Sequence, residues 1–365
     1  KNLCKTLLKT MCIVLGILIL ALLAYIVYLY ASYYRIEDNQ ELVVEAPVDD
    51  TTTGAAAVLA TDTEYSAVTY NIGFGAYLPD YSFFMDGGTS SWAESPETVQ
   101  YAINGAGELV KSLDPDFALI QEIDLDATRS YHTDEYEMLR NLLPEYTTVF
   151  AQNYDSAFLF YPFTQPHGSS RAGLGLFSKY PVSSALRRSF PISTSFSKFF
   201  DLDRCYSVSR IPVDNGKELV IFNLHMSAYG NSDEIRKGQI EMLCNDMAKE
   251  YEAGNYVLCG GDFNHDLKAS EEDAENCESW AFPFPRTELP EHFAFCLDLL
   301  SSEEKESLWN SARNADMEYV PGVTYTVTLD GFIISDNIEC LSYENVNTGY
   351  SYSDHDPVKV EFALK

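Results

Sequence analysis

Basic side chains are scarce in this sequence. Its 365 residues include 24 Lys and Arg but 55 Asp and Glu, so the formal net charge is −31 at pH 7. A charge of this size repels a polyanion unless a local basic groove or bound cations compensate for it. Acidity is also common in soluble secreted proteins, so it lowers the expectation of a nucleic-acid partner without excluding one.

Three familiar patterns are missing as well. The eight cysteines include no Cys-x-x-Cys pair, which argues against a zinc knuckle. There is no Gly-rich phosphate-binding loop and no internal repeat of the solenoid type. Cys277 and Cys296 flank a Pro-rich loop, and the sequence leaves open whether they pair.

One long apolar run occurs, at the N-terminal end. No charged residue lies between Thr10 and Tyr34, and Lys1, Lys5 and Lys9 precede this stretch. About 20 apolar residues cross a hydrocarbon core. We therefore expect a basic cytoplasmic tail over 1–9 and a single transmembrane anchor over 10–34. The positive-inside rule then places the rest of the chain on the extracytoplasmic side of the cell membrane. A cleaved signal peptide is the alternative, but the apolar run is longer than such peptides need.

Two further regions follow the anchor. Residues 36–65 are acidic and rich in Thr and Ala, which predicts a stalk that could add an edge strand to the next domain. Over 66–365, short β-rich runs alternate with helical patterns, and helices are expected over 95–113, 132–143, 233–252 and 301–313. Many strands follow one another directly. An α/β fold with mixed sheets and helices on their outer faces is therefore expected.

Polar residues stand alone at the ends of several apolar strands. Two residues apart on an extended segment, Asp262 and Asn264 share a face after "YVLCGG". Single polar residues at strand ends usually form turns, but a turn does not explain so many of them. The set consists of Asn71, Glu122, His225, Asp262, Asn264, Asp330, Asp354 and His355.

These residue types form a coherent chemical set. Oxygen ligands without cysteine, here Asn71, Glu122 and Asp354, favour Mg²⁺ or Mn²⁺ over structural zinc. Two histidines near carboxylates suit acid–base work or stabilisation of an oxyanion. Together they favour hydrolysis of a phosphate ester, in which a metal and hydrogen-bond donors neutralise charge on the phosphoryl oxygens.

The chain from Ser66 to Lys365 also resembles a known family. "TYNIGFG", "LIQEID", "GLGLFSKYPV", "NLHMSA", "GGDFN", "LDGFI" and "SDHDPV" follow the order of motifs in the endonuclease/exonuclease/phosphatase superfamily. That superfamily includes deoxyribonucleases of the pancreatic type and bacterial sphingomyelinases. The resemblance implies a four-layer α/β sandwich, with two central mixed β-sheets flanked by helices, and metal-dependent hydrolysis of phosphoesters.

The resemblance also implies roles for individual residues. Glu122 matches the principal metal carboxylate, with Asn71 and Asp354 beside it. Asp262 matches the residue that orients or deprotonates the attacking water, and Asn264 the amide that contacts the phosphate. The remaining matches are His355 at the scissile phosphate, Asp330 as its orienting carboxylate, His225 on the side of the leaving group, and Arg204 as a phosphate-binding arginine.

Some of these assignments compete with simpler interpretations. Arg204 could instead form a surface ion pair with Asp201 or Asp203, and His265 has no counterpart in the motif and is expected in a loop. His167 and Arg171 fit a turn better than the rim of a pocket. Two aromatic stretches, 76–92 and 156–168, could bind a lipid, base or sugar, although aromatic residues more often anchor loops to a core.

The resulting prediction is a membrane-anchored phosphodiesterase that requires Mg²⁺ or Mn²⁺. Its partners are a phosphoester of unknown class and the membrane; intracellular nucleic acid is not expected, and no oligomer is inferred. A nuclease for extracellular DNA or RNA is the first alternative, although it would need a basic track. The second is a binding protein that kept the fold and lost catalysis, which the intact set of site residues disfavours.

Overall fold

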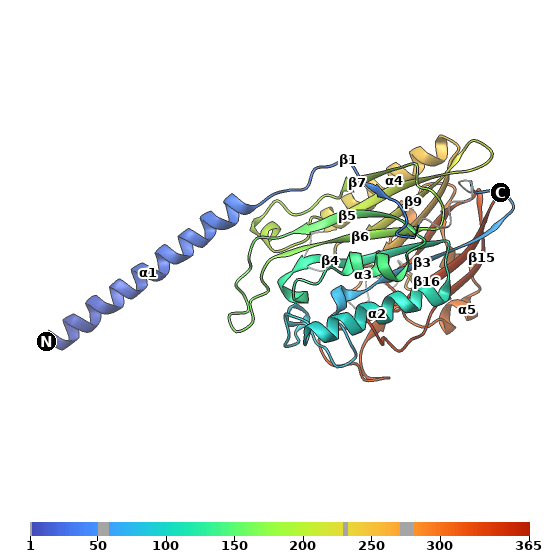
Figure 1. Cartoon of the computed structure of the whole chain (residues 1–365). Helices are drawn as coiled ribbons and strands as arrows, with labels where there is room; N and C mark the ends of the chain where they lie inside the picture. The colour runs from blue at the N-terminus through green and yellow to red at the C-terminus, as the bar shows by residue number, and fades with distance from the viewer. Residues whose placement is uncertain (1, 50–57, 229–232, 271–279) are drawn as a thin grey trace.

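Two β-sheets packed face to face form the centre of the protein. The computed structural model describes residues 2–49, 58–228, 233–270 and 280–365, and Figure 1 shows their arrangement. Both sheets have seven strands and both are mixed, since only the β9–β10 and β3–β4 neighbours run parallel. This confirms the α/β fold expected from the sequence.

The first sheet has the order β1 (Gln40–Glu41), β7 (Ser184–Ser189), β8 (Cys205–Pro212), β9 (Glu218–His225), β10 (Tyr256–Asp262), β14 (Asp330–Ser335), β11 (Phe293–Phe295). The second has the order β15 (Ile338–Asn345), β16 (Val358–Leu364), β3 (Glu64–Asn71), β4 (Phe117–Ala127), β6 (Ser170–Ser178), β5 (Thr147–Asp155), β2 (Val44–Glu45). A separate pair consists of β12 (Ala312–Arg313) and β13 (Thr326–Val327).

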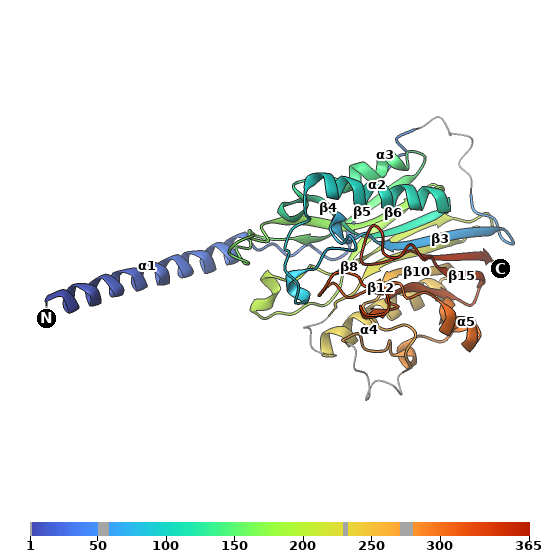
Figure 2. The same cartoon turned by 90° about the horizontal axis from the view of Figure 1, so that it is seen from below.

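Helices cover the outer faces of both sheets, which completes four layers (Figure 2). α2 (Pro96–Leu113) and α3 (Glu135–Leu142) lie over the second sheet, and α4 (Asp233–Glu252) and the short α5 (Ser302–Ser307) lie on the side of the first. α2 begins where the Ser95 side chain accepts a hydrogen bond from the backbone of Thr98, a typical N-cap. Its buried residues recur every three or four positions, as in Val99, Ile103 and Val110.

The prediction of a helix over 301–313 is wrong beyond Ser307, where α5 ends. Trp309 and Ser311 turn inward, where they donate hydrogen bonds to Asp356 and Asp330, and these side-chain partners hold the segment out of a helix. The run "YTVTLDGFII" contains two strands, since Thr328 and Leu329 separate β13, which pairs with β12, from β14 of the first sheet.

The N-terminal helix α1 (Asn2–Ser32) projects from the domain (Figure 1). It is the one helix, among the described residues, that is long and apolar enough to cross a membrane. At about 1.5 Å per residue it is roughly 46 Å long, more than a hydrocarbon core requires. The segment that follows α1 pairs with both sheets of the domain. β1 extends the first sheet beside β7, and β2 extends the second beside β5.

Candidate active site

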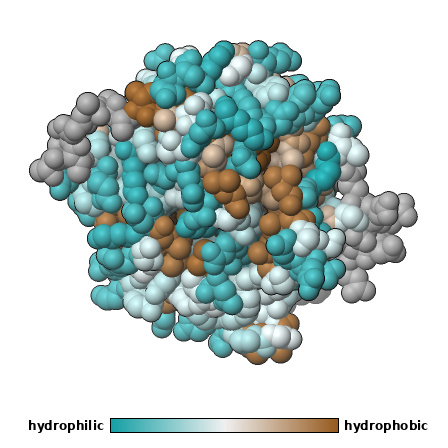
Figure 3. Space-filling view, turned by 90° about the vertical axis from the view of Figure 1, so that its right-hand side faces the viewer, coloured by the Kyte–Doolittle hydropathy of each residue, from teal (hydrophilic) through white to brown (hydrophobic). Residues whose placement is uncertain are grey.

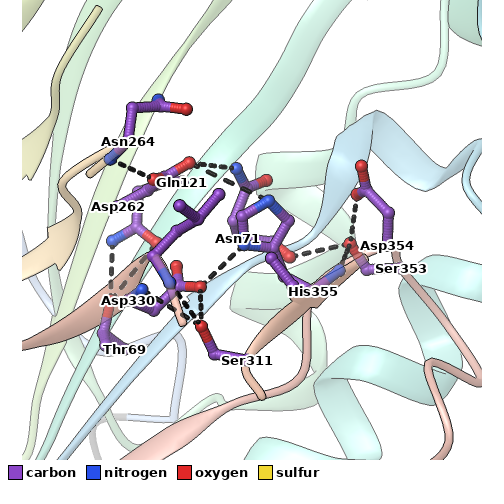
Figure 4. Close-up of polar contacts among 12 residues, drawn as sticks. Thr69, Asn71, Gln121, Asp262, Asn264, Ser311, Asp330, Ser353, Asp354 and His355 are labelled. Carbon is purple, nitrogen blue, oxygen red and sulfur yellow. Dashed lines mark hydrogen bonds and ion pairs between the residues drawn. The ribbon is translucent and has the colours of Figure 1, made fainter. Parts of the chain in front are cut away.

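The polar strand ends predicted from the sequence meet at one end of the two sheets (Figure 4). Asp262 closes β10, where it pairs in register with His225 of β9 on one side and Asp330 of β14 on the other. Asn71 closes β3 of the second sheet, and its side-chain amide reaches across to Asp262 at 3.1 Å. Residues from both sheets therefore share one site.

Two glycines make this approach of the sheets possible. A Cβ atom on Gly260 would lie 3.1 Å from Leu119 of the opposite sheet and 2.5 Å from the Phe332 ring. Gly261 has φ +145°, and a Cβ there would lie 2.1 Å from the carbonyl oxygen of Leu224. Only glycine fits these positions, and the strand consequently delivers Asp262 into the gap between the sheets.

The Asp262 carboxylate is buried and held from two sides. Its Oδ1 accepts a hydrogen bond from the backbone N–H of Asn264 at 2.8 Å, and its Oδ2 accepts one from the Asn71 amide. Burial and the nearby Asp330 charge raise the pKa of Asp262 to about 7, although His355 acts in the opposite direction. A carboxyl group with this pKa suits a general base near neutral pH.

His355 and Asp330 form a buried pair. Nδ1 of His355 lies 2.7 Å from Oδ2 of Asp330, which also accepts a hydrogen bond from the Ser311 hydroxyl at 2.7 Å. Burial opposes a charge on His355, but Asp330 and the other carboxylates prevail and raise its pKa well above the usual value. Its Nε2 lies 3.9 Å from Oδ2 of Asp262, so the free side of the ring faces that carboxylate.

His225 is the second histidine of the site. Its Nε2 lies 3.6 Å from Oδ2 of Asp262 and 3.9 Å from Oε1 of Glu122. Burial, helped by the positive charge of Arg204, lowers its pKa well below the usual value, so the ring is neutral. Among the described residues its Nδ1 has no hydrogen-bond partner.

Glu122 occupies a distorted position in β4. The register of β4 against β6 shifts between Ile120 and Ile123, and Glu122 has φ +57°. A β-bulge with a left-handed glutamate costs free energy of order 1–3 kcal/mol, and such strain is concentrated at functional sites. The bulge directs the carboxylate toward the Asn71 amide, 3.2 Å away.

The acidic side of the site fits a divalent cation. Burial raises the pKa of Glu122, and the charge of Asp354 raises it further; burial also raises the pKa of Asp354. A bound cation would stabilise the charged forms of both carboxylates, and carboxylate oxygens are ligands that Mg²⁺ and Mn²⁺ accept. Asn71, the third predicted ligand, uses its oxygen to accept a hydrogen bond from Gly73 and its nitrogen to bind Glu122 and Asp262. In this arrangement it positions the carboxylates.

A second acidic group also lies close enough for a metal. Ligand atoms of Asp262, Asp330 and His355 lie within 4.8 Å of one another. Because His355 and Asp330 already hydrogen-bond to each other, we favour Glu122 and Asp354 as the metal ligands.

Arg204, which is predicted to bind phosphate, lines the cavity described below. It is buried, and its Nε and Nη1 have no hydrogen-bond partner among the described residues. Its nearest carboxylate, on Asp201, is 3.9 Å away, whereas Asp203 pairs with Arg35 at 2.8 Å. Arg204 therefore keeps a long ion pair with Asp201, but it is buried rather than on the surface. Asn264, the other predicted contact, donates one amide hydrogen bond to the Met226 carbonyl and retains a second N–H.

The outcome for the remaining candidates differs from residue to residue. His265 lies in the loop after β10, as expected, and is buried there, with its ring 5.5 Å from that of Phe284 and its Nδ1 hydrogen-bonded to the Phe263 carbonyl. His167 lines the cavity described below, whereas Arg171 is exposed and pairs with Asp126. Cys277, and with it the possible pair with Cys296, lies outside the described residues.

Sequence reasoning missed Arg129. It is buried and forms two hydrogen bonds with Asp124, and its guanidinium lies 3.7 Å from the centre of the Phe74 ring. It lines the same cavity as Glu122. Its segment "DATRS" contains no motif, so only its partner Asp124, at the end of "LIQEID", offered a signal.

A cavity of about 1380 Å³ opens over the site. Seven of the predicted residues line it, whereas Asn71 and Asp330 lie behind them as supports. The seven are Glu122, Arg204, His225, Asp262, Asn264, Asp354 and His355.

Comparisons with known proteins agree with this architecture. Residues 68–299 match the model of the endonuclease/exonuclease/phosphatase family. Among curated proteins, none matches the chain. Solved structures with the same fold include an endonuclease/exonuclease/phosphatase from Beutenbergia cavernae, at TM-score 0.54 and 16% identity over 82% of this chain and 72% of that one. TDP2 of D. rerio, solved with a single-strand DNA product, has TM-score 0.55 and 14% identity over 83% and 100% of the chains. The human Nocturnin catalytic domain, solved with a sulfate anion, has TM-score 0.53 and 18% identity over 83% and 95%.

Proposed function

We propose, from the premise that this chain belongs to the endonuclease/exonuclease/phosphatase family and is a hydrolase of phosphate ester bonds, that it cleaves a phosphodiester outside the cytoplasm. The observation that supports this best is the arrangement around Asp262. A base with a pKa near 7 lies between two histidines, and Arg204, whose Nε and Nη1 have no hydrogen-bond partner in the part of the chain that the structure describes, lines the same cavity.

Glu122 and Asp354 would hold Mg²⁺ or Mn²⁺ at the acidic side of the cavity. A divalent ion there supplies positive charge that neutralises the phosphoryl oxygens. Arg204, which directly precedes β8, supplies a second positive charge to the same cavity. The phosphate would lie between Arg204 and the side of the cavity that carries Glu122 and Asp354. Asn264 would offer it the remaining amide N–H.

Asp262 then accepts a proton from water as the water oxygen bonds to phosphorus. The ester bond opposite this oxygen breaks, and its electron pair leaves with the alcohol oxygen, which takes a proton from solvent. His355, kept charged and oriented by Asp330, donates a hydrogen bond to a phosphoryl oxygen as charge develops. The neutral His225 donates one on the side of the leaving oxygen. Asn71 holds Glu122 and Asp262 in their relative positions throughout.

Hydrolysis of bis(p-nitrophenyl) phosphate by the full-length protein tests this proposal. We expect nitrophenol release with Mg²⁺ or Mn²⁺ and none after exhaustive treatment with EDTA. Release that persists after chelation would contradict the role of the metal. No release under any metal would favour the inactive binding protein. A nuclease is the weaker candidate, because the net charge of −31 opposes a polyanion.

A further inference from the structure

The cavity over the catalytic residues extends to the N-terminal helix. Its wall includes Glu122 and His355 at one end and Leu22, Tyr25 and Ile26 of α1 at the other. Its volume of about 1380 Å³ exceeds the 300–1,000 Å³ typical of sites for drug-sized ligands. The predicted transmembrane anchor is therefore part of the wall of the catalytic cavity.

Apolar side chains surround the end of the cavity next to α1. We call them the lip; it lies on loops that contain no catalytic residue. Its exposed members are Met85, Tyr161, Phe163, Phe196 and Phe200, with exposed fractions between 41% and 76%. Large exposed apolar groups gathered in one place mark an interaction site.

The lip is attached directly to α1. The rings of Tyr25 and Phe160 are 4.4 Å apart, and those of Tyr30 and Phe199 are 4.8 Å apart. The Tyr25 hydroxyl donates a hydrogen bond to the Phe158 carbonyl at 3.1 Å. The loops that carry Phe160 and Phe199 are thus fixed at the outer end of the helix.

This end of the helix lies where a bilayer would end. Twenty residues counted from Thr10 span about 30 Å, the thickness of a hydrocarbon core, and reach Leu29. The contacts of α1 with the lip, from Tyr25 to Tyr33, then lie at the boundary between acyl chains and headgroups. The opposite end of the domain is different: hydrophilic residues predominate there, and hydrophobic ones form separate patches (Figure 3).

We infer that the substrate is a phosphodiester of a membrane lipid. It would enter from the bilayer that holds α1, with its acyl chains along the lip and the α1 residues and its phosphate between Arg204 and the Glu122 side. This inference deepens the proposed function and rests on it. A single lipid phosphate also meets less repulsion from the acidic protein than a nucleic-acid chain does. Water adds to phosphorus as described above, so the products are an alcohol and a phosphomonoester.

The test uses the full-length protein in vesicles of phosphatidylcholine, phosphatidylethanolamine and phosphatidylglycerol. Mass spectrometry follows the phosphomonoesters formed in the aqueous and lipid phases, and bis(p-nitrophenyl) phosphate is assayed in the same vesicles. Phe163→Ser removes the most exposed aromatic ring of the lip, at 76%. Phe163→Leu keeps an apolar side chain there, and Leu341→Ser removes an exposed apolar residue outside the cavity wall.

We expect lipid hydrolysis by the wild type, and a ratio of lipid to soluble-diester hydrolysis that falls about tenfold in Phe163→Ser. Phe163→Leu should keep this ratio within about threefold, and Leu341→Ser should leave it unchanged. Cleavage of the soluble diester without any lipid hydrolysis would overturn the lipid inference and leave the proposed function standing. An equal ratio in Phe163→Ser and wild type would overturn the role of the lip. Failure on both substrates would refute the proposed function itself.

Discussion

Substitution of either His355 or Asp262, which face each other in the active site, should nearly abolish turnover. The two substitutions are His355→Ala, which removes a hydrogen-bond donor, and Asp262→Asn, which removes the base. The side chains face each other across 3.9 Å, so one phosphoryl group and its attacking water contact both. Neither substitution changes a core apolar contact. We therefore expect the folded structure to persist.

The magnitude follows from what each group does. Loss of one preorganised donor to developing charge costs about 10²–10³ in kcat, or about 2.7–4 kcal/mol. Each single substitution should thus lower kcat at least about a hundredfold. Since both residues act on one transition state, the double mutant should fall far short of the product of the two effects.

The assay is steady-state hydrolysis of bis(p-nitrophenyl) phosphate with Mg²⁺, and thermal unfolding checks that each variant is folded. His265→Ala is the matched control, because His265 is also a buried histidine near the strand end but does not line the cavity. Its kcat should stay within about threefold of wild type. If His265→Ala proved as damaging as Asp262→Asn while His355→Ala kept near-normal turnover, the assignment of the site would be refuted.

Three further predictions concern the metal, acid stability and topology. Glu122→Gln should raise the Mg²⁺ concentration needed for half-maximal activity at least about tenfold, and an unchanged Mg²⁺ titration would exclude Glu122 as a ligand. Burial lowers the pKa of His265 to about 4, so the unfolded chain gains a proton below about pH 6.5 that the folded protein does not take up until about pH 4. Between pH 7 and 4.5 the wild type should consequently lose about 2–3 kcal/mol of unfolding free energy relative to His265→Gln; parallel pH curves from denaturant titrations would contradict this. Protease added to intact cells should release the domain but spare a tag placed before Lys1, and a domain protected until lysis would reverse the topology.

Residues at strand ends were predictable because two local signals coincide there. "YVLCGGDFN" contains both a buried strand and the glycines that end it, so the position of Asp262 follows from the sequence itself. Arg129 lacks such a signal, since its role depends on the Asp124 and Phe74 side chains that the fold brings to it. Only part of the apolar lip was an open alternative, in the stretches 76–92 and 156–168, whereas Phe196 and Phe200 were not predicted. Its meaning depends on contact between Tyr25 and Phe160, which are 135 positions apart in the chain, and no local pattern encodes such contacts.

The ends of a helix were predictable where the local pattern sets them, and not where distant side chains do. The helix over 233–252 matches α4, whose buried residues recur every three or four positions, as in Ile240, Leu243 and Met247. The segment after Ser307 has helical residues as well, yet Ser311 is needed to bind Asp330 behind the catalytic histidine. The hydrogen bonds of Trp309 to Asp356 and of Ser311 to Asp330 hold this segment out of a helix, and these partners lie 47 and 19 positions away.

The edge strands β1 and β2 have a practical consequence for any shortened form of the protein. Each covers the outermost hydrogen-bonding edge of a sheet, β1 beside β7 and β2 beside β5. A protein that starts at residue 66 would lose both covers, and β7 and β5 would present unpaired backbone groups to neighbouring molecules. Such open edges template aggregation, and that form also loses Glu64 and the buried Tyr65 of β3, so its poor solubility would follow from a damaged fold rather than from a missing membrane. A form that starts at Ile36 retains both strands and is the sounder choice for crystallisation.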